Sequence, residues 1–228
     1  MSSRMIRVRV KICGITSIED AHCAVDAGAD ALGFIFVEKT PRYVEPAAAA
    51  SIIAQLPPFV TTVGIFWDHA LGHIKAVAAE AGLGALQFHG EEKPEDLAGY
   101  DLPVIKTIKL PPASTIEGLP EFRVTEGFQV LSYSKVAAAV LLDTAVRWSE
   151  GETREPLEWR HAARIVATYR DRPRPRVILS GGLTPENVAR AIGIVRPYAV
   201  DVNSGVEASP GTKDPDKVRR FVAAARSA

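Results

Sequence analysis

The sequence has few cysteines and no net charge. Only two of the 228 residues are cysteine, Cys13 and Cys23, too few for a disulfide framework in a chain of this size, so we expect both to be reduced. The 27 basic residues balance the 27 acidic ones, which gives no reason to expect a nucleic acid or an anionic membrane surface as partner. There is no apolar run long enough to span a bilayer and no charged-then-apolar leader, so we expect a cytoplasmic protein.

Short apolar segments alternate with helical patterns along the whole chain. We predict strands at residues 6–12, 31–36, 61–66, 85–88, 104–108, 138–142, 177–179 and 199–202. We predict helices from residues 16–17 to Gly28, at 46–55, 69–81 and 157–170, from 184 to 191, and from 214–215 to 225. The unit after residue 88 is short. Residues 110–136 fit the pattern least well, and we expect one helix between 116 and 131.

This alternation predicts the fold class. Strands that alternate with helices form a parallel sheet with right-handed crossovers. Eight such units in 228 residues, with no break in composition, predict an α/β protein made of a single (β/α)8 TIM barrel over residues 1–228. Residues 1–5 should be a loose N-terminal lead-in. A doubly wound open sheet is the alternative, although five or six strands would suit it better.

Two successive strand ends near the C-terminus are rich in small residues. Ser-Gly-Gly follows the strand at 177–179, and Asn-Ser-Gly follows the strand at 199–202. Small residues let backbone N–H groups approach a ligand, and barrels of this class hold phosphate after strands seven and eight. We predict that phosphate is bound by Gly181, Gly182, Ser204 and Gly205; the alternative is two ordinary tight turns. Thr184 with Pro185 is typical of a helix start, with Thr184 as N-cap.

Two residues at predicted strand ends could act as base and acid. Cys13 is followed by Gly14, and Lys11 on the same strand face could supply the positive charge that a thiolate base needs. Asp143 follows four apolar residues, a setting that tends to raise a carboxyl pKa and suits general acid catalysis. Lying on strands one and six, they would face each other across the barrel mouth. The alternatives are a small buried hydrophobic residue for Cys13, as we assign Cys23, and a turn cap for Asp143.

Other polar residues could bind a substrate. Arg42 could hold a carboxylate in a bidentate fork, although exposed arginines are mostly just solvated. His89 is either a ligand contact or an ordinary hydrogen-bonded histidine. His69 and His73 lie four apart on a helix that should be on the outside, with no glutamate to complete a zinc motif, so we expect no metal site. No dinucleotide-binding or P-loop motif is present, and we expect no cofactor.

Taken together, motifs at nearly every predicted strand end resemble those of the phosphoribosylanthranilate isomerases of tryptophan biosynthesis. The resemblance covers about residues 8–222. The motifs are Lys11-Ile12-Cys13-Gly14-Ile15-Thr16, Gly33-Phe34-Ile35-Phe36, Pro41-Arg42-Tyr43-Val44, Val63-Gly64-Ile65-Phe66, Leu86-Gln87-Phe88-His89-Gly90, Leu141-Leu142-Asp143-Thr144, Leu179-Ser180-Gly181-Gly182-Leu183, Val200-Asp201-Val202-Asn203-Ser204-Gly205-Val206-Glu207 and Pro210-Gly211-Thr212-Lys213-Asp214.

The resemblance implies an Amadori rearrangement of a phosphosugar without metal or organic cofactor. It implies that Asp143 is the general acid that opens the furanose ring and that Cys13 is the general base that removes the C2′ proton. Arg42 would hold the anthranilate carboxylate, and Asp201 would lie near the substrate, where it could orient a sugar hydroxyl. The four phosphate-binding residues predicted above would keep that role.

Two segments depart from the family pattern. Family members usually carry a Gly-Gly-Thr-Gly loop soon after the acid of strand six, whereas residues 149–154 here read Ser-Glu-Gly-Glu-Thr-Arg. Two added carboxylates facing a doubly anionic substrate would be unfavourable, so we expect Glu150 and Glu152 to point outward. Residues 110–136 also match the pattern weakly.

Three alternative functions differ in the residues that they need. A related barrel isomerase of histidine biosynthesis, or a two-substrate version, resembles this chain but has an Asp in place of Cys13 and a second phosphate site. A phosphosugar lyase or epimerase would need a Schiff-base lysine or a metal cluster, for which only Lys109 and His89 are candidates. A phosphate-ligand binding barrel without chemistry would have no use for an acid–base pair; it would bind ligand tightly without turnover.

Overall fold

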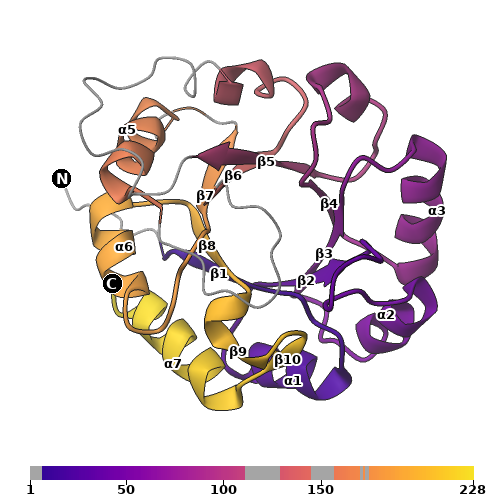
Figure 1. Cartoon of the computed structure of the whole chain (residues 1–228), viewed down its shortest axis with the longest axis horizontal. Coiled ribbons are helices and arrows are strands. Elements are labelled where there is room, and N and C mark those ends of the chain that lie inside the picture. The colour runs from indigo at the N-terminus through magenta and orange to yellow at the C-terminus, as the bar shows by residue number, and fades with distance from the viewer. Residues whose placement is uncertain (1–6, 111–128, 145–156, 170–171, 173–174) are drawn as a thin grey trace.

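The computed structural model describes residues 7–110, 129–144, 157–169, 172 and 175–228. Eight parallel strands close into a barrel in which β1 pairs with both β2 and β8, which confirms the predicted (β/α)8 fold. Figure 1 looks down this barrel and shows the helices around the ring of strands. The strands are β1 (Arg9–Cys13), β2 (Ala31–Ile35), β3 (Thr61–Phe66), β4 (Ala85–Phe88), β5 (Val104–Leu110), β6 (Ala139–Thr144), β7 (Arg176–Leu179) and β8 (Ala199–Val202).

Helices follow most of the strands. They are α1 (Ile18–Asp26), α2 (Pro46–Ile53), α3 (Leu71–Ala81), α5 (Trp159–Tyr169), α6 (Val188–Val195) and α7 (Pro215–Arg226), with short 3-10 turns η1 (Pro94–Leu97) and η3 (Ser204–Val206). Residues 129–132 are also helical, and the rest of the segment in which we predicted a helix lies outside the described residues. A hairpin of β9 (Glu207–Ser209) and β10 (Thr212–Lys213), which we did not predict, follows η3.

The predicted starts of the first and last helices are confirmed. Ser17 caps α1 by accepting a hydrogen bond from the Asp20 N–H, and Gly28 beyond its end has a positive φ of 98°. Asp214 caps α7 by accepting from two backbone N–H groups, and Pro215 occupies its first position. These ends depend on local side-chain chemistry, which is why the pattern of residues predicts them.

Two predicted helix starts are wrong. Thr184 and Pro185 do not begin α6, because the Asn187 side chain bonds to the backbone of Thr184 and Gly182 and holds a turn; the helix starts at Val188. The helix expected from His69 starts at Leu71, since His69 Nδ1 instead accepts a hydrogen bond from the Trp67 N–H.

Several strands also have ends that differ from the prediction. β1 begins at Arg9 and includes Cys13, and residues 1–6 lie outside the described part of the chain. β5 continues to Leu110 and β6 to Thr144, so that Lys109 and Asp143 belong to strands and are paired in register. These residues are therefore held by sheet hydrogen bonds at the rim of the barrel.

The barrel wall separates a large outer core from a smaller interior. In β1, Val10 and Ile12 face outward into the main core between strands and helices. Lys11 and Cys13 are buried on the alternate positions, as period-2 geometry requires of the inner face. Lys11 and Cys13 therefore both point into the barrel, where Lys11 is the register partner of Asp201 in β8.

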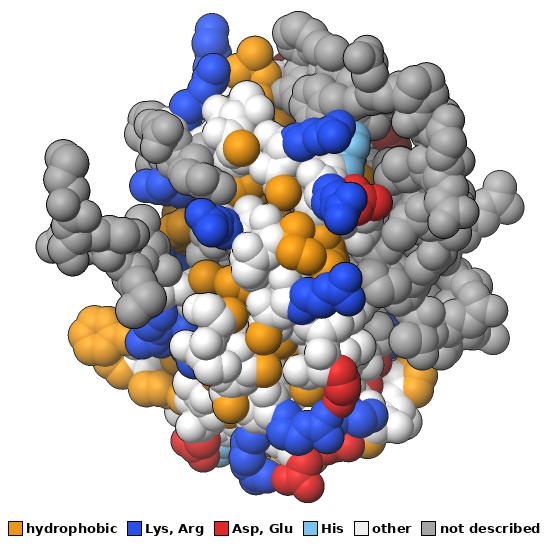
Figure 2. Space-filling view, turned by 90° about the vertical axis from the view of Figure 1, so that its left-hand side faces the viewer, with side chains coloured by type: hydrophobic (Ala, Val, Ile, Leu, Met, Phe, Trp, Pro, Cys, Tyr) orange, Lys and Arg blue, Asp and Glu red, His pale blue; other side chains and the backbone are white. Residues whose placement is uncertain are grey.

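The outer surface carries mixed charge. Figure 2 shows the side on which α5 and α6 lie, where Lys and Arg side chains are scattered among apolar and uncharged ones. None of the helices that the structure describes combines the length and apolarity of a membrane span.

Candidate active site

Cys13 lies at the carboxyl end of β1, where Gly33 makes room for it. The thiol is 5% exposed, and a Cβ on Gly33, its register partner in β2, would lie only 2.8 Å from Cys13 Sγ. Burial raises the pKa of the Cys13 thiol above its ordinary value, an effect that the nearby Lys11 ammonium only partly offsets. The sulfur is thus buried and needs positive charge to ionise.

The positive charge is the Lys11 ammonium, which is held in place by residues of strand β8 and the end of β7. Lys11 is paired in register with Asp201 of β8, and its Nζ donates to Asp201 Oδ1 over 2.6 Å with both side chains buried. Burial alone would lower the pKa of Lys11, but Asp201 and Cys13 together raise it above its ordinary value. Ser180, at the end of β7, donates to the other Asp201 oxygen over 3.1 Å. The two predicted site residues Cys13 and Asp201 are therefore linked through Lys11.

Asp143 lies on the other side of the mouth. Its strand, β6, is separated from β1 by β7 and β8 in one direction around the barrel. Asp143 is 3% exposed; Oδ1 accepts the Thr144 N–H over 2.8 Å, and Oδ2 lies 3.7 Å from His89 Nε2. A Cβ on Gly181, which has a φ of 80°, would lie 3.1 Å from Asp143 Oδ1. Asp143, His89 and Gly181 are thus brought together.

The two glycine-containing turns meet at this end of the barrel. β7 and β8 are neighbours, and a Cβ on Gly205 would collide with the Leu183 carbonyl of the other turn. Gly181 and Gly182 both have positive φ, a conformation that suits glycine. Among the hydrogen bonds of the described residues, none uses the N–H of Gly181 or Gly182 as donor. The turns can therefore offer donors to an anion.

Arg42 is brought to the same mouth but already holds a carboxylate of the protein. Its Nε and Nη2 donate to Glu207 Oε1 and Oε2 over 2.8 and 2.7 Å, and Lys213 Nζ also contacts Glu207, over 3.1 Å. Sequence reasoning gave Glu207 and Lys213 no role. Pro210-Gly211 between them is a turn signal that could have indicated the hairpin that joins them.

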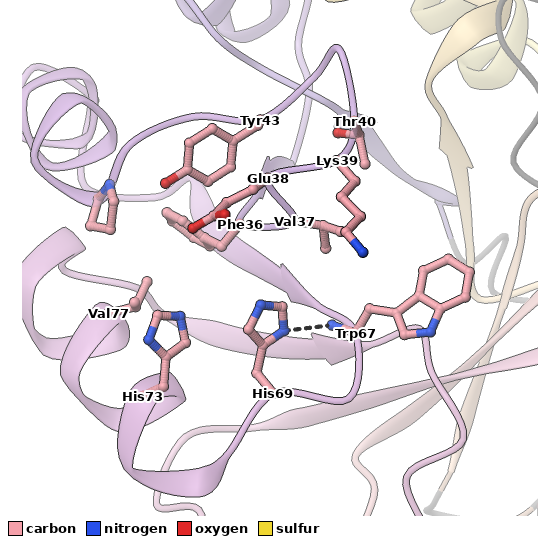
Figure 3. A pocket seen from close by; sticks show the side chains of 11 residues that line it. Phe36, Val37, Glu38, Lys39, Thr40, Tyr43, Trp67, His69, His73 and Val77 are labelled. Atoms are coloured by element: carbon pink, nitrogen blue, oxygen red, sulfur yellow. Dashed lines mark hydrogen bonds between the residues drawn. The ribbon is translucent and has the colours of Figure 1, made fainter.

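Figure 3 shows a cavity beside the start of α3. It has a volume of about 680 Å³ and lies between the loop after β2 and the start of α3. Phe36, Tyr43 and Trp67 are among its walls, and the stacked rings of His69 and His73 lie 5.1 Å apart on one side. The Trp67 ring is 5.5 Å from that of His89, so the cavity shares a wall with the mouth.

We expected no metal site, and we expected two glutamates of the loop after β6 to point outward. Within the described part of the chain, no three His, Cys, Asp or Glu side chains gather in a group that could hold a metal ion. Glu150 and Glu152, expected to point outward, lie outside the described residues.

Known proteins resemble this chain over almost its whole length. The family model of N-(5'-phosphoribosyl)anthranilate (PRA) isomerase matches residues 10–224. The N-(5'-phosphoribosyl)anthranilate isomerase of Geobacter sp. (strain M21) is 46% identical over 218 residues, which are 96% of this chain and 98% of the relative. That of Pseudomonas fluorescens (strain Pf0-1) is 46% identical over 222 residues, 97% of this chain and all of the relative.

Solved structures agree with the sequence comparison. The crystal structure of phosphoribosyl anthranilate isomerase from Thermotoga maritima has a TM-score of 0.80 and 41% identity, covering 97% of this chain and 100% of that one. A phosphoribosyl anthranilate isomerase in complex with reduced 1-(o-carboxyphenylamino)-1-deoxyribulose 5-phosphate has a TM-score of 0.77 and 41% identity, with the same coverage. The chain therefore belongs to the N-(5'-phosphoribosyl)anthranilate isomerase family, whose members are isomerases of tryptophan biosynthesis.

Proposed function

We propose that this protein converts N-(5'-phosphoribosyl)anthranilate to 1-(2-carboxyphenylamino)-1-deoxyribulose 5-phosphate in an Amadori rearrangement that needs no metal or organic cofactor. The observation that carries the proposal is the set of contacts around the mouth. It runs from Cys13 through Lys11 and Asp201 to Ser180, and the adjoining Gly181 packs against Asp143. The relative with a bound reduced deoxyribulose phosphate adds support.

The first step opens the sugar ring. Asp143 acts as general acid and gives its proton to the furanose ring oxygen, the C1′–O bond breaks, and the nitrogen lone pair forms a protonated Schiff base with C1′. His89 Nε2, 3.7 Å from the Asp143 carboxylate, contacts the same region and can bind the opened sugar.

The second step is the removal of the proton on C2′. Cys13 as thiolate removes the C2′ proton, whose electrons form a C1′–C2′ double bond and return the nitrogen lone pair, giving an enolamine. The enolamine then loses the proton of its C2′ hydroxyl and gains one at C1′, which yields the ketone. Lys11 stabilises the thiolate, and Asp201 next to it orients a sugar hydroxyl.

Binding groups surround these two residues. The backbone N–H groups of Gly181, Gly182, Ser204 and Gly205 cradle the phosphate, since the two turns meet at one place. Arg42 binds the anthranilate carboxylate. A histidine-pathway substrate is disfavoured because Cys13 stands where those enzymes have Asp.

A turnover assay with freshly prepared N-(5'-phosphoribosyl)anthranilate tests this function. We expect Cys13→Ser and Asp143→Asn each to lower kcat roughly 100-fold or more while product binding and the circular dichroism spectrum are retained. Cys23→Ser, which changes the other cysteine, should keep wild-type turnover. Tight product binding by a wild-type protein that does not turn over would instead identify a phosphate-ligand binding protein.

A further inference from the structure

The hairpin β9–β10 is built to reach the loop that carries Arg42. Gly211 at its turn has a φ of 85°, and a Cβ there would lie 2.6 Å from the Pro41 carbonyl oxygen, so only glycine lets the two backbones approach this closely. The Gly211 carbonyl also accepts a hydrogen bond from Thr16 Oγ1 over 2.6 Å. The hairpin is thereby fixed between the loops after β1 and β2, with Glu207 at one end of it.

Glu207 holds the Arg42 guanidinium by one edge. The two hydrogen bonds use Nε and Nη2, and the side chains are only 14% and 5% exposed. A guanidinium has a second fork of parallel N–H groups, formed by Nη1 and Nη2, which this geometry leaves turned away from Glu207. The Arg42 side chain passes over Gly14, since a Cβ there would lie 3.3 Å from Arg42 Cδ.

Lys213 lies against the same carboxylate; burial lowers the pKa of its ammonium, an effect that Glu207 and Cys13 partly offset. Its side chain is fully buried, and Nζ donates to Glu207 Oε1 over 3.1 Å and to Asn203 Oδ1 over 3.0 Å. Burial would raise the pKa of Glu207, but the Arg42 hydrogen bonds and the Lys213 charge lower it below its ordinary value. One ionised carboxylate between two cations leaves a net positive charge, so a further carboxylate can bind to Arg42 without displacing Glu207.

We propose that Glu207 is a positioning residue. By accepting hydrogen bonds from Nε and Nη2 of Arg42, it orients the Nη1/Nη2 edge of the guanidinium toward the carboxylate of the substrate. Lys213 supplies the charge that allows two carboxylates to share one arginine. Because Arg42 binds the substrate carboxylate only under the proposed function, the role of Glu207 rests on that function.

Loss of Glu207 should weaken binding of the substrate carboxylate without changing the rate of the chemical steps. In Glu207→Gln the amide can match only one of the two Arg42 donors, so the guanidinium is free to turn away. We expect KM to rise roughly 10- to 100-fold while kcat changes little, because an interaction equal in ground state and transition state is lost.

The test compares two ligands that differ only in that carboxylate. Calorimetry gives the dissociation constants of reduced 1-(o-carboxyphenylamino)-1-deoxyribulose 5-phosphate and of its counterpart made from aniline. The dissociation constant of the aniline counterpart divided by that of the carboxylate ligand measures what the carboxylate contributes. In Glu207→Gln this ratio should fall about tenfold, while affinity for the aniline counterpart stays at the wild-type value. Asp216→Asn, which breaks an exposed pair with Arg219, is the matched control and should leave the ratio unchanged.

The outcomes separate the two proposals. If Arg42→Met leaves the ratio unchanged, Arg42 does not bind the carboxylate and that part of the proposed function fails. If Arg42→Met lowers the ratio to about one but Glu207→Gln keeps the wild-type ratio, the positioning role alone is overturned. Should Glu207→Gln not fold, Glu207→Asp keeps the buried charge but shortens its reach; a wild-type ratio in that variant also overturns the role, and a lowered ratio supports it.

Discussion

The pKa of Cys13 determines how activity should depend on pH. Burial raises the pKa of this thiol, and only the thiolate can remove a proton from carbon. With a folded-state pKa above the ordinary value of about 8.5, the thiolate fraction grows only as pH rises through that higher value. We therefore expect the ascending limb of kcat/KM, which reports the free enzyme, to lie at a more alkaline pH than the ionisation of an ordinary cysteine thiol.

The variant Lys11→Met should move this limb further toward alkaline pH. Lys11 lowers the pKa of Cys13 while Asp201 raises it, so removing the ammonium leaves burial and a carboxylate acting in the same direction. The measurement is the pH dependence of kcat/KM from pH 6 to 10 for wild type and variant. Lys75→Met, an exposed lysine on α3, serves as control. An unshifted or more acidic limb in Lys11→Met would show that Lys11 does not set the ionisation of the base.

Sequence alone identified a candidate site residue where its position at the end of a strand was enough to suggest a role. Cys13, Asp143 and Asp201 were singled out because they stand at the ends of apolar segments or in family motifs, and the structure places each at the barrel mouth. Glu207 and Lys213 also lie in family motifs, but neither ends an apolar segment and we gave neither a role. Their pairing with Arg42 depends on a short hairpin that joins loops far apart in the chain, which periodicity cannot predict.

At the scale of elements, one buried ion pair ties together the loops after β3 and β4. Glu92 Oε1 accepts the backbone N–H groups of Asp68 and Gly90, while Glu92 Oε2 pairs with Lys106 Nζ of β5 over 2.8 Å. Lys106 Nζ also donates to the Gly90 carbonyl over 2.6 Å. These loops carry Trp67 and His89, so the pair fixes one side of the mouth.

Glu92→Ala should be strongly destabilising. It would leave Lys106, 3% exposed, as a buried charge without its carboxylate and would free two backbone donors, at a cost of about 3–5 kcal/mol. Urea unfolding followed by far-UV circular dichroism measures this loss.

The neighbouring residue gives a matched control. Glu91 pairs with Lys109 over 3.5 Å but is 88% exposed, so Glu91→Ala should lower the free energy of unfolding by less than about 1 kcal/mol. Equal losses for Glu91→Ala and Glu92→Ala would show that burial of the Lys106 pair contributes nothing extra.

The type and order of the elements were predictable because the same pattern, an apolar strand segment followed by turn residues and a helical segment, recurs along the chain. The start of α6 was not, since the Asn187 side chain competes with the helix for the backbone of Thr184. The hairpin β9–β10 was missed because its strands are too short to show alternation. The first error comes from a side-chain contact that outweighs local propensity, and the second from strands too short to carry a period.

At the scale of the whole molecule, the chain must close on itself. β1 pairs with β8, and α7 packs against α1 and β1, so the last helix lies over the seam where the two ends of the barrel meet (Figure 1). Arg226, at the end of α7, donates to the Gly28 carbonyl over 2.6 Å and to Asp30 Oδ2 over 2.7 Å. Asp30 in turn accepts the Val10 N–H of β1.

Arg226→Ala should therefore weaken closure of the whole barrel. Hydrogen bonds to a charged group contribute about 1.5–3 kcal/mol each in favourable settings, and this side chain is only 21% exposed. We expect the urea midpoint to fall, and to fall equally by far-UV circular dichroism and by tryptophan fluorescence, because a single-domain barrel loses its seam and its opposite side together. Arg219→Ala on the same helix removes an exposed pair with Asp216 and should leave the midpoint nearly unchanged. A fall seen by one probe alone would mean that the two ends of the chain unfold as separate units, against the single-domain prediction.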